Sequence, residues 1–183
     1  MIELTRYFMT NVLHKVPYLQ PFIHKVRIAS VEKNKVTYEL EIEKDHCNLR
    51  GTMHGGMAST LLDSLTACTA LSATGSKDKR VLSVEMKTRF ISPVKMGETV
   101  LLETRVLRTG KTLLFAEMDI VEKVSKRYCL PKWILWRKYR KSYWCKAIIL
   151  CMFMRRETEN RPAQVKGNKQ MKMDDYMAAA CEK

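Results

Sequence analysis

A glycine-rich segment that leads into a long apolar pattern is the feature that most constrains the fold of this chain. The segment spans residues 48–63, NLRGTMHGGMASTLLD, and contains Gly51, Gly55 and Gly56. Glycine permits backbone dihedrals and close approaches that other residues resist. The sequence therefore predicts a loop that delivers free backbone N–H groups to the start of a helix, a geometry that attracts anions and developing negative charge.

The helix predicted over residues 57–73 contains one acid and no base. Its apolar face at helical spacing consists of Ala58, Leu61, Leu65 and Cys68. Asp63 is the single charged residue of this stretch. An unpaired acid in such a helix is costly unless it has a partner or a role. Asp63 is thus either a functional carboxylate or an acid hydrogen-bonded to nearby hydroxyls such as Ser59 or Thr66.

Extended segments follow an N-terminal helical stretch and flank the glycine-rich region. Residues 2–16 have helical spacing, with Leu4, Phe8, Val12 and also Met9 on one face, and Pro17 and Pro21 end this helix. The predicted strands are 26–31, 35–42, 81–90, 98–108 and 112–121, with turns at 32–35 and 109–111. One long helix with strands in hairpin succession predicts an α+β fold with an antiparallel sheet wrapped around the helix.

Four sequence blocks resemble one known family. Besides residues 48–63 these are VLSVEM at 81–86, FISPVKMGE at 90–98 and GKTLLF at 110–115. In order and spacing they resemble the hotdog-fold acyl-coenzyme A thioesterases of the phenylacetate-degradation type, over roughly residues 1–124. The resemblance implies a hotdog fold and hydrolysis of medium- or long-chain fatty acyl-coenzyme A to free fatty acid and coenzyme A, a reaction of lipid metabolism. It implies no metal or redox cofactor, and a homodimer of the kind that often pairs into a homotetramer.

The resemblance also assigns roles around the glycine-rich loop. It implies that the Gly55 amide stabilises the oxyanion of the reaction, while His54 and Gly56 shape the turn. It implies that Asp63 acts as general base on water, or as nucleophile, opposite the loop of the partner subunit. Without the resemblance, the glycines could serve packing alone.

Further residues are assigned by the same resemblance. Asn48 would position the acyl group or water, and Ser83 would orient the attacking water. Read alone, Asn48 is an ordinary turn residue and Ser83 a solvent-facing strand serine. The phosphates of coenzyme A need cations, for which the candidates are Lys87, Arg89, Arg108 and Lys111; each of them also fits a solvated charged face. Met53 and Met57 are candidates for an apolar acyl slot, or simply core residues.

The composition changes near residue 124. Residues 1–124 hold 18 Lys/Arg and 14 Asp/Glu, whereas residues 125–183 hold 15 and 5, so that most of the net charge of +14 lies in the second part. All three tryptophans also lie there. We therefore predict a thioesterase domain at 1–124 and a divergent basic tail at 125–183.

The tail departs from the pattern of the family. Relatives end with one more strand inside the sheet, where Pro131 would be disfavoured because it cannot donate to a ladder. Either residues 133–136 (WILW) replace that strand or the sheet is incomplete. The polar residues 155–172 are predicted to be disordered.

The longest uninterrupted apolar run, residues 147–154, is too short to span a bilayer.

The sequence is compatible with two other functions. The altered end could leave a catalytically weak acyl-coenzyme A binding protein. Alternatively, tryptophans and tyrosines interleaved with bases over residues 132–146 suit peripheral contact with an anionic membrane surface, as in an adaptor. No nucleic-acid motif is present, so nucleic-acid binding is not predicted.

Cysteine usage and the N-terminus bear on localisation. The six cysteines form no CxxC pair, which favours reduced thiols, with Cys68 as a small core residue. The N-terminus lacks an apolar h-region and a small-residue cleavage site, which argues against a secretory signal. Arg6, His14 and Lys15, with Glu3 as the only acid, leave a mitochondrial address open, so a cytoplasmic or mitochondrial location, or both, is expected.

Overall fold

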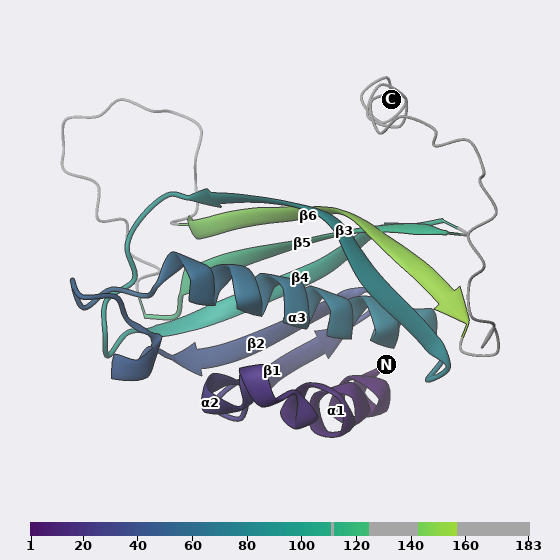
Figure 1. The fold of residues 1–183 in the computed structure, drawn as a ribbon, viewed down its shortest axis with the longest axis horizontal. Helices are drawn as coiled ribbons and strands as arrows, with labels where there is room; N and C mark the ends of the chain where they lie inside the picture. The colour runs from purple at the N-terminus through teal and green to yellow at the C-terminus, as the bar shows by residue number, and fades with distance from the viewer. Residues whose placement is uncertain (111, 125–142, 157–183) are drawn as a thin grey trace, which may run out of the picture.

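The fold consists of a six-stranded antiparallel sheet that curves around one long helix (Figure 1). The computed structural model describes residues 1–110, 112–124 and 143–156. Its helices are α1 (Ile2–Asn11), α2 (Gln20–Ile23) and α3 (Gly55–Thr74), with 3₁₀ turns at Leu13–Lys15, Pro17–Leu19 and Lys44–His46. Its strands are β1 (Arg27–Glu32), β2 (Lys35–Glu41), β3 (Lys79–Phe90), β4 (Thr99–Thr109), β5 (Leu113–Glu122) and β6 (Tyr143–Arg156). This arrangement confirms the predicted α+β hotdog fold.

The core lies between α3 and the inward face of the sheet. The predicted apolar face of α3 is confirmed, because Leu61 and Leu65 are fully buried and Ala58 and Cys68 nearly so. On β2 the side chains predicted to face inward, Val36, Tyr38 and Leu40, are buried, as is Ile42 just after the strand, but Thr37 is buried as well. Each large aliphatic side chain that leaves water here, such as Leu61 or Leu65, contributes on the order of 1.5–3 kcal/mol, so this shared face fixes the helix against the sheet.

The N-terminal helix is shorter than predicted. α1 ends at Asn11 rather than at residue 16, and a 3₁₀ turn follows at Leu13–Lys15. Phe8 and Met9 are buried as expected, but Val12 is 42% exposed. The tighter 3₁₀ turn rotates the chain so that Leu13, at 7% exposure, enters the core in place of Val12.

The strand order is β1-β2-β4-β5-β6-β3, so the last strand in the chain lies between β5 and β3. β6 was not predicted from the sequence; residues 143–156 occupy the place of the last strand of the family. Residues 133–136, the predicted replacement, lie outside the described residues. The segment predicted to be disordered begins inside β6, and the rest of it, 157–172, is also outside them. The division into domains at residue 124 stays a prediction.

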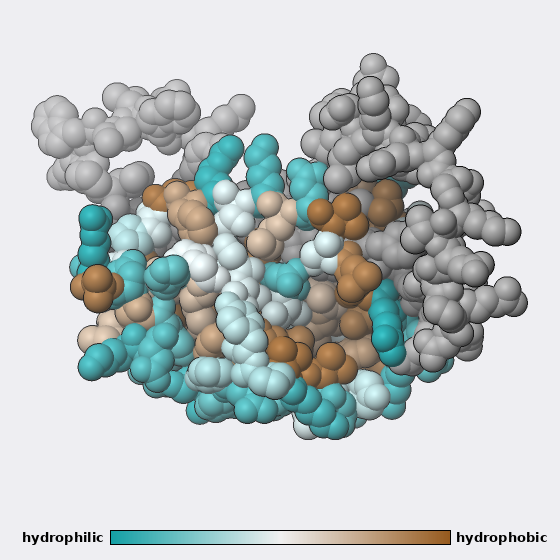
Figure 2. All heavy atoms as spheres, viewed as in Figure 1, coloured by the Kyte–Doolittle hydropathy of each residue, from teal (hydrophilic) through white to brown (hydrophobic). Residues whose placement is uncertain are grey.

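The sheet ends in β3, which carries a row of exposed apolar side chains. Leu82, Val84 and Met86 are 67%, 45% and 40% exposed, and Figure 2 shows that apolar patches interrupt the polar surface on the viewed face. Unpaired edge strands with apolar side chains are templates for association with another chain. Among the described residues, no helix is long and apolar enough to cross a membrane.

Candidate active site

The glycine-rich loop is held together by its own side chains. The Asn48 amide oxygen accepts a hydrogen bond from the Arg50 backbone N–H (2.8 Å), and its amide nitrogen donates to Thr52 Oγ1 (3.0 Å). Gly51 has a φ of +70°, which requires glycine for an unstrained turn. In this structure, the Asn48 side chain therefore bonds within the loop, as expected for the turn residue that the sequence also allowed.

The loop ends in a cap at the N-terminus of α3. His54 is the N-cap residue, and its Nδ1 accepts a hydrogen bond from the Gly56 N–H at 2.9 Å. The Gly55 N–H, at the first helical position, donates to no acceptor among the described residues. An N–H group at a helix N-terminus without an intrahelical partner carries partial positive charge toward an incoming anion. The cap therefore leaves the amide of Gly55 available while it occupies that of Gly56.

Asp63, on α3, contacts strand β3. Ser83 Oγ donates a hydrogen bond to Asp63 Oδ1, so the partner of this acid is Ser83 rather than Ser59 or Thr66. Thr66 Oγ1 bonds the backbone carbonyl of Leu62 at 2.5 Å instead. No base in the described part of the chain forms an ion pair with Asp63, which is half-buried. A carboxylate held by one hydroxyl keeps free lone pairs for a further ligand.

A bulge in β3 accompanies this pairing. The register of β3 against β6 shifts between Ser83 and Glu85. A bulge re-aims the side chains beside it, and bulges are common next to active sites. The contact between Ser83 and Asp63 therefore lies next to a local irregularity of the sheet.

The two candidate centres lie apart on the same helix. Gly55 and Asp63 are eight positions apart in α3, a separation of about 12 Å at the helical rise of about 1.5 Å per residue. A reacting carbonyl must lie about 3 Å from both the oxyanion donor and the attacking water. Within one chain, the Gly55 amide and the Asp63 carboxylate therefore do not meet at one point.

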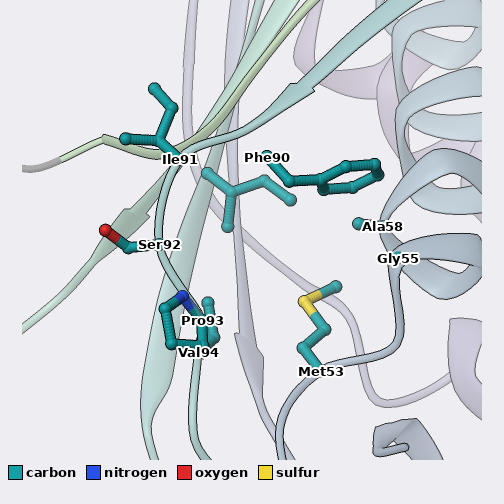
Figure 3. Close-up of a pocket in the computed structure, with 9 residues that line it drawn as sticks. Met53, Gly55, Ala58, Phe90, Ile91, Ser92, Pro93 and Val94 are labelled. Atoms are coloured by element: carbon teal, nitrogen blue, oxygen red, sulfur yellow. The ribbon is translucent and has the colours of Figure 1, made fainter.

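Two hollows open beside the loop. The first, of about 370 Å³, lies between the start of α3 and the segment after β3 (Figure 3). Its lining is mostly apolar: Met53, Gly55, Ala58, Phe90, Ile91, Ser92, Pro93, Val94 and Ile120. The second, of about 950 Å³, is lined by Lys44, Cys47, Asn48, Leu49, Arg50, Gly51, His54 and Met96. Asp63 and Ser83 line neither hollow, and Met57 is a buried core residue.

The predicted phosphate-binding cations are not gathered in one place. Lys87 and Arg89 are exposed near the end of β3, whereas Arg108 is exposed at the end of β4, which is the opposite end of the sheet. Lys111 lies outside the described residues. Two cations that were not predicted from the sequence, Lys44 and Arg50, line the larger hollow beside Asn48 and His54. Arg50 lies inside the glycine-rich motif, and this position could have identified it as a candidate phosphate-binding residue.

A buried histidine supports the loop from behind. His46 is 1% exposed, and its Nδ1 accepts a hydrogen bond from the Glu43 N–H at 3.1 Å. Its carbonyl oxygen accepts from the N–H of His54, at 2.9 Å. Burial lowers the pKa of His46, helped by the positive charge of Lys25 and opposed by Glu43 and Asp45. A protonated Nδ1 would face the Glu43 N–H as donor against donor, so the loop needs the neutral imidazole.

We expect acid to destabilise the chain through His46. As the pH falls through the ordinary histidine pKa of 6.5, the unfolded chain takes up a proton that the folded chain resists, so stability falls from about pH 7 toward pH 5. His46→Asn keeps an acceptor oxygen and removes the titration, so its urea-denaturation midpoint should lose part of this pH dependence. The same change at exposed His24 is the control, and equal pH profiles for the parent and His46→Asn would contradict the prediction.

No metal site is evident in the described residues, since no group of three or more His, Cys, Asp or Glu side chains is placed to hold an ion. Cys47 and Cys68 are free thiols there. Burial raises the pKa of Cys68 to about 11, as suits an inert core residue.

Comparison with known proteins agrees with the fold and the motif. Residues 50–129 match the Thioesterase superfamily. Acyl-coenzyme A thioesterase 13 of Mus musculus is 36% identical over 119 residues, which cover 63% of this chain and 81% of that protein. The crystal structure of zebrafish thioesterase superfamily member 2 superposes with a TM-score of 0.61 at 25% identity, and the match covers 83% of this chain and 94% of that one. A hypothetical thioesterase of Streptococcus pneumoniae solved with coenzyme A shares the fold at a TM-score of 0.59 and 16% identity, over 75% and 91% of the two chains. This chain belongs to the thioesterase superfamily and has its hotdog fold.

Proposed function

We propose that this chain hydrolyses medium- or long-chain fatty acyl-coenzyme A to free fatty acid and coenzyme A. The observation that carries the proposal is the pair of features on α3: an N–H at Gly55 that has no acceptor among the described residues, and the Asp63 carboxylate held by Ser83. The names of the relatives support the substrate class, because Acyl-coenzyme A thioesterase 13 of mouse is 36% identical. The proposal includes a role in lipid metabolism, in the cytoplasm or in mitochondria.

The chemistry assigns one task to each group. Asp63 takes a proton from water, the water oxygen attacks the carbonyl carbon of the thioester, and negative charge develops on the carbonyl oxygen. The Gly55 N–H stabilises that charge, as preorganised donors do in acyl transfer. The C–S bond then breaks, and the thiolate of coenzyme A leaves and is protonated. Ser83 holds the carboxylate, and His54 and Asn48 keep the loop in shape.

The site is completed by a second copy of the chain. Because Gly55 and Asp63 of one chain are about 12 Å apart, a two-fold axis that pairs the Asp63 of one protomer with the Gly55 of the other gives two complete sites. The exposed apolar row of Leu82, Val84 and Met86 on the edge strand β3 supports such an interface. The proposal therefore includes a homodimer, which can pair further into a homotetramer.

The two hollows divide the substrate between them. The apolar hollow bordered by Met53, Ala58 and Ile120 suits the acyl chain. Lys44 and Arg50 line the larger hollow, and we infer that they bind phosphate groups of coenzyme A. Lys87 and Arg89 remain candidates for contacts with the phosphates of coenzyme A that is bound at the site of the other protomer. Met57 is excluded from the lining of the acyl hollow, because it is packed in the core.

The test is hydrolysis by the full chain. Palmitoyl-coenzyme A and octanoyl-coenzyme A are incubated with the protein, and the released thiol is measured with a thiol reagent. Saturable turnover above that of a heat-denatured sample is expected, from a species whose sedimentation corresponds to a dimer or tetramer. Tight binding of both substrates without thiol release would instead indicate an acyl-coenzyme A binding protein.

A further inference from the structure

Phe90, at the end of β3, contacts the start of α3. Its ring points at Gly55: a methyl group added to Gly55 would lie 3.3 Å from Phe90 Cζ, 3.5 Å from Cε1 and 3.7 Å from Cε2. Figure 3 shows the ring directed from the strand toward the helix, above Ala58 and Gly55. A Cβ at position 55 would therefore make the Phe90 ring give way by a few tenths of an ångström.

The same ring forms one wall of the apolar hollow. Met53 and Val94 line the hollow near the loop, and Ala58 and Ile120 line it where it meets the core, at 5% and 1% exposure. Phe90 is 57% exposed. The ring thus stands at the mouth of the hollow, between solvent and an apolar interior, without being locked there by the core.

The position of Phe90 beside Gly55 would bring its ring close to the carbonyl end of the acyl group. If the Gly55 N–H holds the carbonyl oxygen, a side chain in contact with Gly55 lies beside the first carbons of the acyl chain. A flat ring at this place would narrow the space beside the carbon next to the carbonyl, which would disfavour a branched or aryl carbon there more than an unbranched chain. Each additional carbon that a pocket must accept or refuse changes selectivity by about 10–200-fold.

We propose that Phe90 is a specificity-determining residue that selects acyl groups unbranched at the carbon next to the thioester. The inference rests on the proposed function, since it presumes that Gly55 binds the carbonyl oxygen. It concerns which acyl group is accepted, not whether hydrolysis occurs. Removal of the ring should therefore change the preference among substrates more than the rate with the best one.

The experiment compares Phe90→Ala with the parent chain on a matched pair of substrates, hexanoyl-coenzyme A and 2-methylhexanoyl-coenzyme A. We expect the ratio of kcat/KM for the branched over the straight substrate to rise at least 10-fold. Leu107→Ala is the matched control, because Leu107 is also a strand residue with similar exposure, 55%, and lines neither hollow. Its ratio should equal that of the parent.

Two additions keep the result decisive. Phe90→Leu is smaller but still apolar, so it should show a partial shift of the ratio if Phe90→Ala does not fold. Non-hydrolysable S-alkyl thioether analogues with straight and branched chains are titrated in parallel. An inactive parent whose binding ratio still shifts in Phe90→Ala contradicts the proposed function but not the role of Phe90. An unchanged ratio in both hydrolysis and binding overturns the role of Phe90.

Discussion

Asp63→Asn is expected to lower kcat for acyl-coenzyme A hydrolysis by about 10²–10⁴-fold, the range over which a general base typically contributes. Asparagine retains an oxygen that can accept the hydrogen bond from Ser83, so the contact between α3 and β3 persists. It cannot take a proton from water. Because binding groups are untouched, KM should change much less than kcat, which is the pattern of an interaction made in the transition state. Steady-state kinetics with palmitoyl-coenzyme A provide the measurement.

The control for this change is Asp78→Asn. Asp78 is an exposed acid in the turn between α3 and β3, so its replacement removes the same charge from a nearby surface. It should leave kcat and KM within about twofold of the parent, as is usual for a surface change of small energetic effect. Equal activity of Asp63→Asn and the parent, with both folded by circular dichroism, would exclude Asp63 as base and as nucleophile.

Local patterns in the sequence were enough to place α3 and five of the strands. The inner face of the helix, including Leu61 and Leu65, follows from 3.6-residue spacing, and the alternation around Tyr38 follows from the period of a strand. Such patterns depend on each element having one face in the core, which is a local property. They fail at element ends: α1 stops at Asn11, and the 3₁₀ turn that follows brings Leu13 rather than Val12 into the core.

The sequence does contain a pattern for the sixth strand, but it was used only to argue against a membrane span. Residues 147–154 are an uninterrupted apolar run, the pattern of a strand inside a sheet as well as of a short buried helix. The run is too short for a membrane span, and its length does not indicate which strands it pairs with. The place of β6 between β5 and β3 results from pairing across long stretches of sequence, which no local period encodes.

Only part of the candidate site could be predicted from the sequence. The glycine-rich loop and the isolated acid on α3 were evident, and family resemblance added Ser83. Their contact joins positions 20 residues apart and depends on how β3 is seated against α3, with a bulge beside Ser83. Phe90 and His46 were missed because their roles depend on burial and on contacts with other elements. For His46 a weak signal existed, since Glu43 and His46 have the spacing of a capping box.

The Gly55 amide can be removed without breaking the helix, so its role can be tested directly. Gly55 is the first residue of α3, a position where proline is well tolerated because that N–H has no helical partner. His54 precedes it with φ −69° and ψ 132°, the extended conformation that a residue before proline prefers. Gly55→Pro therefore deletes the N–H while it preserves the path of the backbone.

We expect Gly55→Pro to have a kcat about 10²–10³-fold below that of Gly55→Ala, which corresponds to the loss of one oxyanion donor. Alanine is the necessary reference, because both variants add a Cβ that lies 3.3 Å from Phe90 Cζ, and only proline lacks the N–H. Helix content by circular dichroism should be the same in both. If the two variants are equally slow, the loss comes from the contact with Phe90 rather than from the missing donor. If both are as fast as the parent, the oxyanion is stabilised elsewhere.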